Sequence, residues 1–174
     1  MENFIPDIYQ KNIYSIDYDS LKQNDIKCIL FDLNNTIVPY NSTLISNKLK
    51  LFIDELKLKG FKIIILSNST KNRIRKFKNE LNLDSAAFSL KPSTRKLKKI
   101  MKLYNFKYHE MCIIGDTLIT DISSGNRFGI LTILVNSMST KVSWHKKPIN
   151  LIENIIRKRL TKKDKWKIGE YYEL

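Results

Sequence analysis

Short apolar runs rich in β-branched residues alternate along this chain with longer segments of helical periodicity. Such a run predicts a strand, and strands that alternate with helices are typical of a parallel sheet covered by helices. The first run is apolar at nearly every position, as expected of a strand buried on both faces. The predicted strands are residues 26–33, 61–66, 86–89, 111–115 and 130–135. We therefore expect an α/β protein with a parallel sheet of about five strands and helices on both faces.

The segments between these strands have apolar residues at the spacing of an amphipathic helix. Gly60 is a stop signal for the first helix, and residues 67–70 (Ser-Asn-Ser-Thr) supply an N-cap for the second. The predicted helices are residues 46–60, 71–81, 92–104, 119–128 and 149–160. The chain has 174 residues, 43% of them hydrophobic, without a repeat or a linker, so we expect one domain. Within it, residues 1–25 would form an N-terminal segment and residues 161–174 a loosely ordered tail.

The chain has 31 Lys and Arg residues against 17 Asp and Glu residues, a formal net charge of +14. This charge favours an anionic partner: a phosphate ester, a nucleic acid or an acidic membrane surface. A solvated basic face is the alternative, because AT-rich genomes also enrich a chain in Lys, Asn and Ile. Residues 1–12 lack the basic start and apolar run of a signal peptide, and no stretch reaches the roughly 18 apolar residues of a membrane span. We therefore expect a cytoplasmic protein that could meet a membrane only at its surface.

Polar residues follow the predicted strands at their carboxyl ends, where ligands bind in open parallel sheets. These residues are Asp32, Ser67, Lys91, Asp116 and, slightly further along, Asp121. Converging carboxylates suit Mg²⁺, a hard cation that keeps several waters and often shares a substrate phosphate. A lysine and a hydroxyl would complete a phosphate clamp, and a carboxylate can act as a nucleophile. Taken singly, Ser67 could equally be a helix N-cap and Lys91 a solvated lysine, so the prediction depends on order and spacing.

The same residues resemble a known family. Residues 31–37 (Phe-Asp-Leu-Asn-Asn-Thr-Ile) resemble motif I of the haloacid dehalogenase-like (HAD) superfamily, and residues 65–68 (Ile-Leu-Ser-Asn) resemble motif II. Lys91-Pro92 is similar to motif III, and residues 114–121 are similar to motif IV. More narrowly, the chain resembles YqeG-type phosphatases of subfamily IIIA, whose relatives include phosphatidylglycerophosphate phosphatases. This match extends over almost the whole length and includes residues 4–9, 125–127 and 155–160.

The resemblance implies a Rossmann-like fold and a Mg²⁺-dependent phosphatase activity. Asp32 would be the nucleophile that takes the phosphoryl group. Ser67, Asn68 and Lys91 would bind the phosphoryl oxygens, and Lys91 would also offset their negative charge. Arg127 would reach a substrate phosphate, although closing its own helix is the alternative.

The same resemblance implies that Asp32, Asp116, Asp121 and the main-chain carbonyl of Asn34 hold Mg²⁺. Position 34 is also where this chain departs from the family, which usually has an aspartate there that protonates the leaving oxygen and then activates water. Asn34 can form hydrogen bonds but cannot exchange a proton, and loss of general acid–base catalysis typically costs about 10²–10⁴-fold. We therefore expect Mg²⁺ and phosphate to bind while turnover is slow, confined to good leaving groups, or absent.

Some HAD enzymes have a cap domain, but residues 36–61 and 69–86 have room for little more than one helix each, so we expect an open site. An open site suits a large substrate, and the resemblance favours a phospholipid headgroup such as that of phosphatidylglycerophosphate. The basic, amphipathic residues 149–159 could lie on an acidic membrane or simply pack on the sheet. Two other functions stay open: a binding protein for phosphate and Mg²⁺ without turnover, suggested by Asn34, and a phosphatase for nucleic-acid ends, suggested by the charge. The lack of a recognised nucleic-acid-binding motif disfavours the last.

Overall fold

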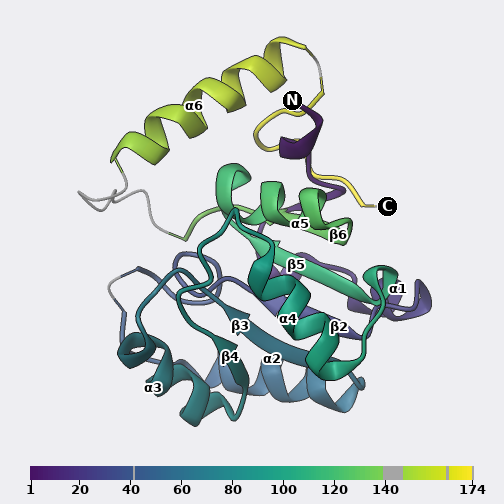
Figure 1. Cartoon of the computed structure of the whole chain (residues 1–174), viewed down its shortest axis with the longest axis vertical. Coiled ribbons are helices and arrows are strands. Elements are labelled where there is room, and N and C mark those ends of the chain that lie inside the picture. The colour runs from purple at the N-terminus through teal and green to yellow at the C-terminus, as the bar shows by residue number, and fades with distance from the viewer. Residues whose placement is uncertain (41, 139–146, 164, 174) are drawn as a thin grey trace.

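The computed structural model describes residues 1–40, 42–138, 147–163 and 165–173. Within these residues, six parallel strands form one sheet in the order β1-β6-β5-β2-β3-β4 (Figure 1). The strands are β1 Ile8–Gln10, β2 Cys28–Phe31, β3 Lys62–Leu66, β4 Asp84–Ala86, β5 Met111–Gly115 and β6 Leu131–Val135. The predicted α/β fold is confirmed, with one strand more than the sequence indicated.

Helices cover both faces of this sheet (Figure 1). They are α1 Tyr18–Gln23, α2 Asn47–Leu58, α3 Lys71–Leu81, α4 Arg95–Tyr104, α5 Ser123–Phe128 and α6 Lys147–Lys162. Helices α1, α2 and α3 pack on the face that includes Phe31 and Ile65, whereas α4 packs on the face that includes Leu30 and Ile64. Successive strand residues point to opposite faces, which explains why β2 is apolar at every position. Among the described residues, α2 alone lies between β2 and β3 and α3 alone between β3 and β4, so no cap domain covers the strand ends.

Four short turns complete the described structure. They are η1 Glu2–Phe4, η2 Ile13–Ser15, η3 Tyr108–Glu110 and the π-helical turn η4 Leu118–Ile122. The predicted helix 119–128 therefore consists of two parts, η4 and α5. At Gly125 a Cβ would lie 2.4 Å from Thr132 Cγ2 and 2.6 Å from Ile113 Cγ2, so a glycine is needed for α5 to lie this close to the sheet.

The additional strand, β1, forms the edge of the sheet beside β6. Tyr9 in β1 pairs with Tyr172 in an antiparallel bridge, with N···O distances of 3.0 and 2.9 Å. Trp166 is buried, and its ring centroid lies 5.3 Å from that of Tyr9. Residues 165–173 thus pack along β1, where the sequence suggested a loosely ordered tail. Aromatic side chains in this segment supply the apolar area that packs on β1. In the sequence they stand among charged residues, so the segment shows no clear apolar pattern.

Helix α6 packs on η4 through one face and leaves the other exposed. Ile156 and Leu160 are buried in a cluster with Leu118 and Ile122 of η4. The exposed apolar residues of α6 are Leu151, Ile152 and Ile155, at 65%, 52% and 43% exposure. The side chains of residues 147–150, Ile149 among them, lie outside the described part. No helix of the described residues is both long and apolar enough to span a bilayer.

Candidate active site

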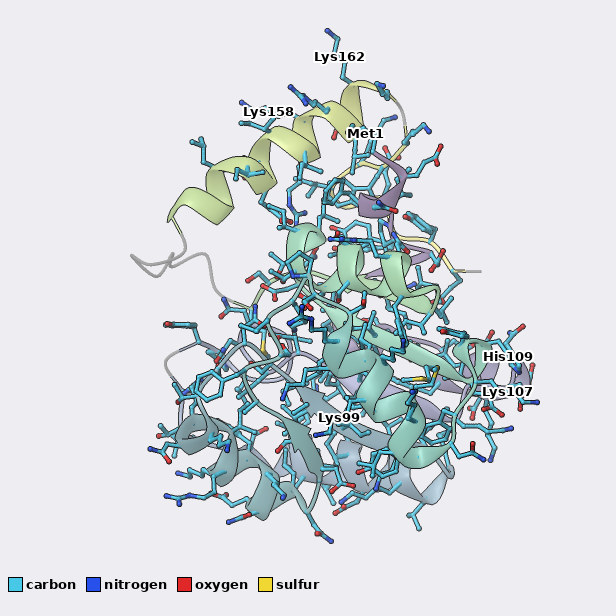
Figure 2. The ribbon with its side chains drawn as sticks, viewed as in Figure 1. Met1, Lys99, Lys107, His109, Lys158 and Lys162 are labelled. Carbon is cyan, nitrogen blue, oxygen red and sulfur yellow. The ribbon has the colours of Figure 1, made fainter. Side chains whose placement is uncertain are left out.

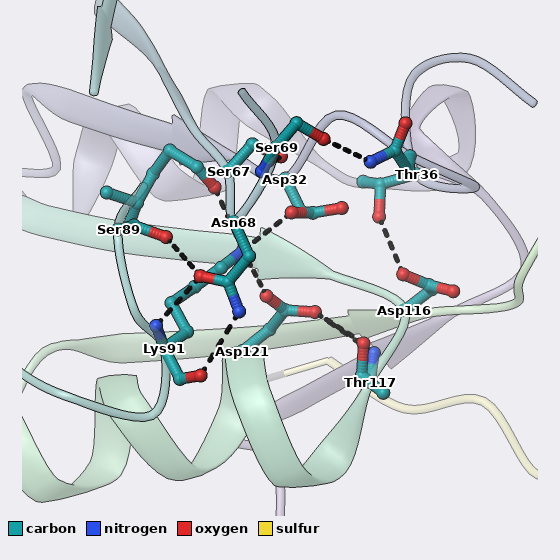
Figure 3. A network of polar contacts seen from close by, with 12 residues as sticks. Asp32, Thr36, Ser67, Asn68, Ser69, Ser89, Lys91, Asp116, Thr117 and Asp121 are labelled. Atoms are coloured by element: carbon teal, nitrogen blue, oxygen red, sulfur yellow. Dashed lines mark hydrogen bonds and ion pairs between the residues drawn. The ribbon is translucent and has the colours of Figure 1, made fainter. Parts of the chain in front are cut away.

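The carboxyl ends of β2, β3 and β5 bring polar side chains together from distant parts of the sequence (Figure 3). Asp32 follows β2, Ser67 follows β3 and Asp116 follows β5, while Lys91 lies in the loop before α4 and Asp121 lies in η4. We call these five residues the strand-end cluster. All five are buried, and Asp32 and Asp116 are each 8% exposed. The cluster is therefore a small polar site at the carboxyl ends of the central strands, which solvent reaches at Asp32 and Asp116.

Lys91 is the cation at the centre of this cluster. Its Nζ lies 2.6 Å from Asp32 Oδ1 and 2.5 Å from Asp121 Oδ1, and it donates a third bond to the Leu66 carbonyl at 2.9 Å. Burial alone would lower the pKa of Lys91, but the carboxylates of Asp121 and Asp32 hold it above its ordinary value. The ammonium therefore keeps its charge and orients one oxygen of Asp32.

Asn68 supports the loop that contains Lys91. Its Oδ1 accepts hydrogen bonds from Lys91 N at 2.8 Å and Ser89 Oγ at 2.6 Å, and its Nδ2 donates to the Lys91 carbonyl at 3.1 Å. Phe88 and Leu90 in this loop have φ values of 47° and 55°, in the left-handed region that is unfavourable for such side chains. The amide of Asn68, which the resemblance assigns to phosphate binding, is thus engaged in holding a strained loop.

Asp121 is fully buried, and both of its carboxylate oxygens have partners. Oδ1 contacts Lys91, while Oδ2 accepts hydrogen bonds from Thr117 N at 3.1 Å and Thr117 Oγ1 at 2.9 Å. A Cβ at Gly115 would lie 2.3 Å from Asp121 Cγ, so only glycine leaves room for this carboxylate. Asp121 therefore serves as a counter-ion of Lys91, and Asp32 and Asp116 are the carboxylates nearer to solvent.

Asp116 is held from two sides. Thr36 Oγ1 lies 3.3 Å from Asp116 Oδ1, and the Asp116 carbonyl accepts a hydrogen bond from Arg157 Nη2 of α6 at 3.3 Å. Glu153, also on α6, accepts from the backbone N–H groups of Leu118 and Ile119 at 2.8 and 3.1 Å. The sequence prediction did not include Glu153 as a site residue or give Arg157 this role, because only the packing of α6 on η4 brings them to this segment.

The side chain of Asn34 is fixed by contacts from one other loop and from α3. Its Nδ2 donates to Ser69 Oγ at 2.7 Å, and its Oδ1 accepts from Arg73 Nε at 2.9 Å. Arg73 also donates to the carbonyls of Ser42 and Pro39 at 3.1 and 3.5 Å. The sequence prediction treated residues 71–81 as a basic helix and missed this contact. One feature of the sequence could have indicated this contact. Arg73 stands three residues after the N-cap Thr70, in a segment that directly follows a strand.

Arg127 does not join the cluster. It is exposed in the last turn of α5, which leads into the start of β6. Leu131, the first residue of β6, pairs with Cys112 near the start of β5, so Arg127 lies near the amino ends of the strands, opposite to Asp32. The structure therefore does not place Arg127 where it could reach a phosphate bound at Asp32, because α5 runs back along the sheet.

A second group with metal-ligand chemistry lies before the amino ends of β2 and β5. It consists of Asp25, His109 and Glu110. Lys27 Nζ lies 3.1 Å from an oxygen of Asp25 and 2.5 Å from one of Glu110, so an ammonium already offsets both carboxylates. We interpret this group as an ion-pair network of two exposed residues, Asp25 and His109, and the buried Glu110.

The charge of the strand-end cluster favours a divalent cation. Its three carboxylates and one ammonium give a formal charge of −3 + 1 = −2 in buried surroundings. Neighbouring carboxylates repel each other unless a cation offsets their charge. Carboxylate and main-chain carbonyl oxygens are the ligands that Mg²⁺ prefers, so Asp32, Asp116 and the carbonyl of residue 34 fit this ion. A carboxylate oriented by a lysine beside a hydroxyl can also attack a phosphorus atom.

Comparison with known proteins agrees with this chemistry. Residues 90–158 match a family described as HAD-hydrolase-like. The probable phosphatase YqeG of Bacillus subtilis (strain 168) is 33% identical over 132 residues, which cover 76% of this chain and 77% of YqeG. Phosphatidylglycerophosphate phosphatase 1, chloroplastic/mitochondrial, of Arabidopsis thaliana is 26% identical over 144 residues, which cover 78% of this chain and 41% of the plant protein. The chain thus spans less than half the length of this second relative.

Solved structures share the fold. The HAD-hydrolase YfnB from Bacillus subtilis, in a magnesium-bound form, aligns with a TM-score of 0.52 at 15% identity, over 67% of this chain and 90% of YfnB. The HAD-like family match includes Lys91, Asp116 and Asp121 of the strand-end cluster. The likeness to YqeG covers more than two thirds of both chains. The chain therefore belongs to the YqeG-type phosphatases of the HAD superfamily and is a phosphoric monoester hydrolase.

Proposed function

We propose that the chain hydrolyses a phosphomonoester through an aspartyl-phosphate on Asp32. The observation that supports this most is the contact from Lys91, which orients one oxygen of Asp32 and holds a positive charge beside it. The other Asp32 oxygen would form a bond to phosphorus while the bond to the leaving oxygen breaks, and that oxygen keeps the electron pair. Ser67 and Lys91 would bind the phosphoryl oxygens. Water would then attack the phosphorus of the aspartyl-phosphate, release phosphate and restore the carboxylate.

The proposed cofactor is Mg²⁺, held by Asp32, Asp116 and the main-chain carbonyl of Asn34. When bound, it would offset the negative charge of the transferring phosphoryl group. The formal charge of −2 in the cluster and the magnesium-bound relative of the same fold support this choice. We assign Asp121 to Lys91 and not to the metal, because its two oxygens already have partners.

Asn34 should slow this reaction. An amide cannot protonate the leaving oxygen or take a proton from the attacking water, so both protons must be exchanged with solvent. A protein that binds phosphate and Mg²⁺ without turnover is therefore the second candidate, and Asn34 is the residue that favours it.

For the substrate we propose a phospholipid with a terminal phosphomonoester, such as phosphatidylglycerophosphate, presented at an acidic membrane surface. The named activity of the Arabidopsis relative supports the lipid, and the uncapped strand ends leave room for a large headgroup. Helix α6 favours the proposal that the substrate is presented at a membrane surface, because its exposed apolar residues lie beside basic ones. Figure 2 shows Lys158 and Lys162 on the side of α6 that faces away from the sheet. A phosphatase for nucleic-acid ends has only the net charge of +14 in its favour.

We also propose that residues 1–174 form one domain. Residues 165–173 and β1 complete the same edge of the sheet, so the N-terminal segment and the tail belong to one core.

Phosphate release by the 174-residue chain in Mg²⁺ tests the proposal. The substrates are phosphatidylglycerophosphate in detergent micelles, glycerol 3-phosphate, p-nitrophenyl phosphate and a 5′-phosphorylated oligonucleotide. We expect the fastest release from the lipid, complete loss in Asp32→Asn, and no change in Asp54→Asn, an exposed aspartate on α2. Release that survives Asp32→Asn would reject Asp32 as the nucleophile. No release from any ester while Mg²⁺ binds would favour the binding protein.

A further inference from the structure

Arg73 is a second cation near the strand ends, and the reaction proposed above gives it no part. Its Nε donates to Asn34 Oδ1 at 2.9 Å. Its Nη1 and Nη2 donate to the carbonyls of Ser42 and Pro39 at 3.1 and 3.5 Å. The guanidinium is thus fixed to backbone and cannot swing away into solvent without losing these bonds.

This contact also fixes the direction of the Asn34 amide. A guanidinium has five N–H donors and no acceptor, so the oxygen of the amide must face Arg73. The nitrogen then faces Ser69 Oγ at 2.7 Å. The amide N–H of Asn34 is therefore oriented by the positive charge of Arg73. The three contacts of Arg73 use only part of its five N–H donors.

The surroundings of Asp32 decide on which side the alcohol part of a substrate must lie. The side chains of Lys91 and Asp121 are 2% and 1% exposed and fill the interior side of Asp32. Arg73 is only partly buried and lies on α3, at the surface. In an in-line displacement the leaving oxygen lies across the phosphorus from the attacking oxygen. A substrate attacked by Asp32 therefore has its leaving oxygen on the side away from Lys91 and Asp121. We place Arg73 on this side, because it is bonded to Asn34, two residues after Asp32, and comes from the surface helix α3.

We propose that Arg73 is a leaving-group residue, whose guanidinium offsets the charge that develops on the leaving oxygen. This inference rests on the proposed function. As Asp32 bonds to phosphorus, the electron pair of the breaking P–O bond goes to the leaving oxygen, and Asn34 cannot donate a proton to it. The resulting alkoxide takes a proton from water, which yields the alcohol and hydroxide. A fixed cation beside the leaving oxygen lowers the free energy of this charge, most of all when the alcohol is a weak acid.

Hydrolysis of esters with graded leaving groups tests this role. The substrates are 2,4-dinitrophenyl, p-nitrophenyl and phenyl phosphate and glycerol 3-phosphate, with saturating Mg²⁺. We expect Arg73→Gln to change hydrolysis of the dinitrophenyl ester little and to slow glycerol 3-phosphate by about 10²-fold, as is typical when a group that stabilises an oxyanion is removed. Arg73→Lys should recover part of this loss, because the charge returns without the full set of contacts. Arg75→Gln, an exposed arginine on the same helix, is the charge-matched control and should behave as wild type.

The outcomes separate this inference from the function on which it rests. An equal loss for every ester in Arg73→Gln, with wild-type hydrolysis intact, would overturn the inference and make Arg73 a structural contact of Ser42 and Pro39. If Arg73→Gln does not fold, Arg73→Lys decides by the same criterion. A wild type that fails to hydrolyse even the dinitrophenyl ester would overturn the proposed function, and this inference with it.

Discussion

At the scale of single residues, the site depends on one lysine. Its ammonium group gives two buried carboxylates the polar partner that water would give them at the surface. Lys91 contacts Asp32 and Asp121 within 2.6 Å and is itself almost inaccessible. A buried pair is weak evidence for stability, because desolvation opposes the attraction, but removing one partner leaves an uncompensated buried charge. The cluster therefore needs Lys91 both to orient Asp32 and to remain folded.

Lys91→Met should lower the free energy of unfolding at pH 7 by about 3–5 kcal/mol, the usual cost of breaking a buried ion pair. The folded-state pKa of Lys91 lies above its ordinary value. Its contribution is therefore fully present below the unfolded lysine pKa of about 10.4 and is lost only as the pH rises through the folded value. Urea unfolding in EDTA should show the same difference from wild type at pH 7 and pH 9, and little effect of the exposed Lys99→Met. A difference that shrinks at pH 9 would contradict this.

The sequence indicated Asp32, Ser67 and Asp116 because each directly follows a buried apolar strand. It could not show what their side chains contact. Asn68 and Asp121 are held by partners in other loops, and Arg73 and Glu153 reach the site from helices whose periodicity reads as ordinary surface. Where such long side chains end depends on how the helices pack, which the local sequence does not determine.

At the scale of elements, the sequence predicts segments with strong hydrophobic periodicity well. It does not predict a strand of a few residues that forms only by pairing with distant segments. The prediction of residues 111–115 and 71–81 matches β5 and α3. Strand β1 was missed because three residues give no period and pair only through β6 and Tyr172. The strand predicted at 86–89 lies at Asp84–Ala86, because positive φ values after it turn the chain toward Lys91.

Helix α6 should influence the metal site through Glu153, which holds the backbone just after Asp116. Glu153→Ala leaves two backbone N–H groups and Arg157 without this partner. We expect it to weaken Mg²⁺ binding about 10-fold, at the low end of the usual effect of outer-shell partners. Titration calorimetry would measure this, with Asp116→Ala expected to abolish binding.

Glu170→Ala, an exposed glutamate in the tail, is the matched control and should bind Mg²⁺ as wild type does. Unchanged affinity in Glu153→Ala would show that α6 does not position Asp116. Unchanged affinity in Asp116→Ala would reject the metal site itself.

At the scale of the whole molecule, α6 has an inner and an outer face with different roles. Arg157 is turned inward, where it pairs with Glu153 and the Asp116 carbonyl, so it is not part of the outer basic surface. Lys158, Arg159 and Lys162 remain exposed beside the apolar residues Leu151, Ile152 and Ile155. A surface with exposed apolar and basic residues suits an acidic lipid interface.

We expect the chain to bind vesicles that contain acidic phospholipid at low salt and to dissociate as salt screens the charges. Changing Lys158, Arg159 and Lys162 to Ser should weaken binding by about 3 kcal/mol, from about 1 kcal/mol per basic residue near the surface. Vesicle sedimentation is the measurement. A matched triple variant on α4, with Lys98, Lys99 and Lys102 changed to Ser, should keep its binding. Equal losses in the two variants would show that net charge, and not α6, is responsible.

We propose that Asp32 is the nucleophile and that position 34 lacks the proton that the leaving oxygen needs. Asn34→Asp restores a carboxyl group on a scaffold that is otherwise complete. Hydrolysis of glycerol 3-phosphate should rise by about 10²-fold, within the usual range for a general acid–base group. The gain should be smaller for p-nitrophenyl phosphate, whose leaving group needs no proton.

The decisive measurement is the rate of glycerol 3-phosphate hydrolysis by wild type, Asn34→Asp and the double variant Asp32→Asn/Asn34→Asp. We expect a large gain in the single variant and no activity in the double variant, because without Asp32 no aspartyl-phosphate forms. A wild type that already matches Asn34→Asp, or a double variant that stays active, would contradict it.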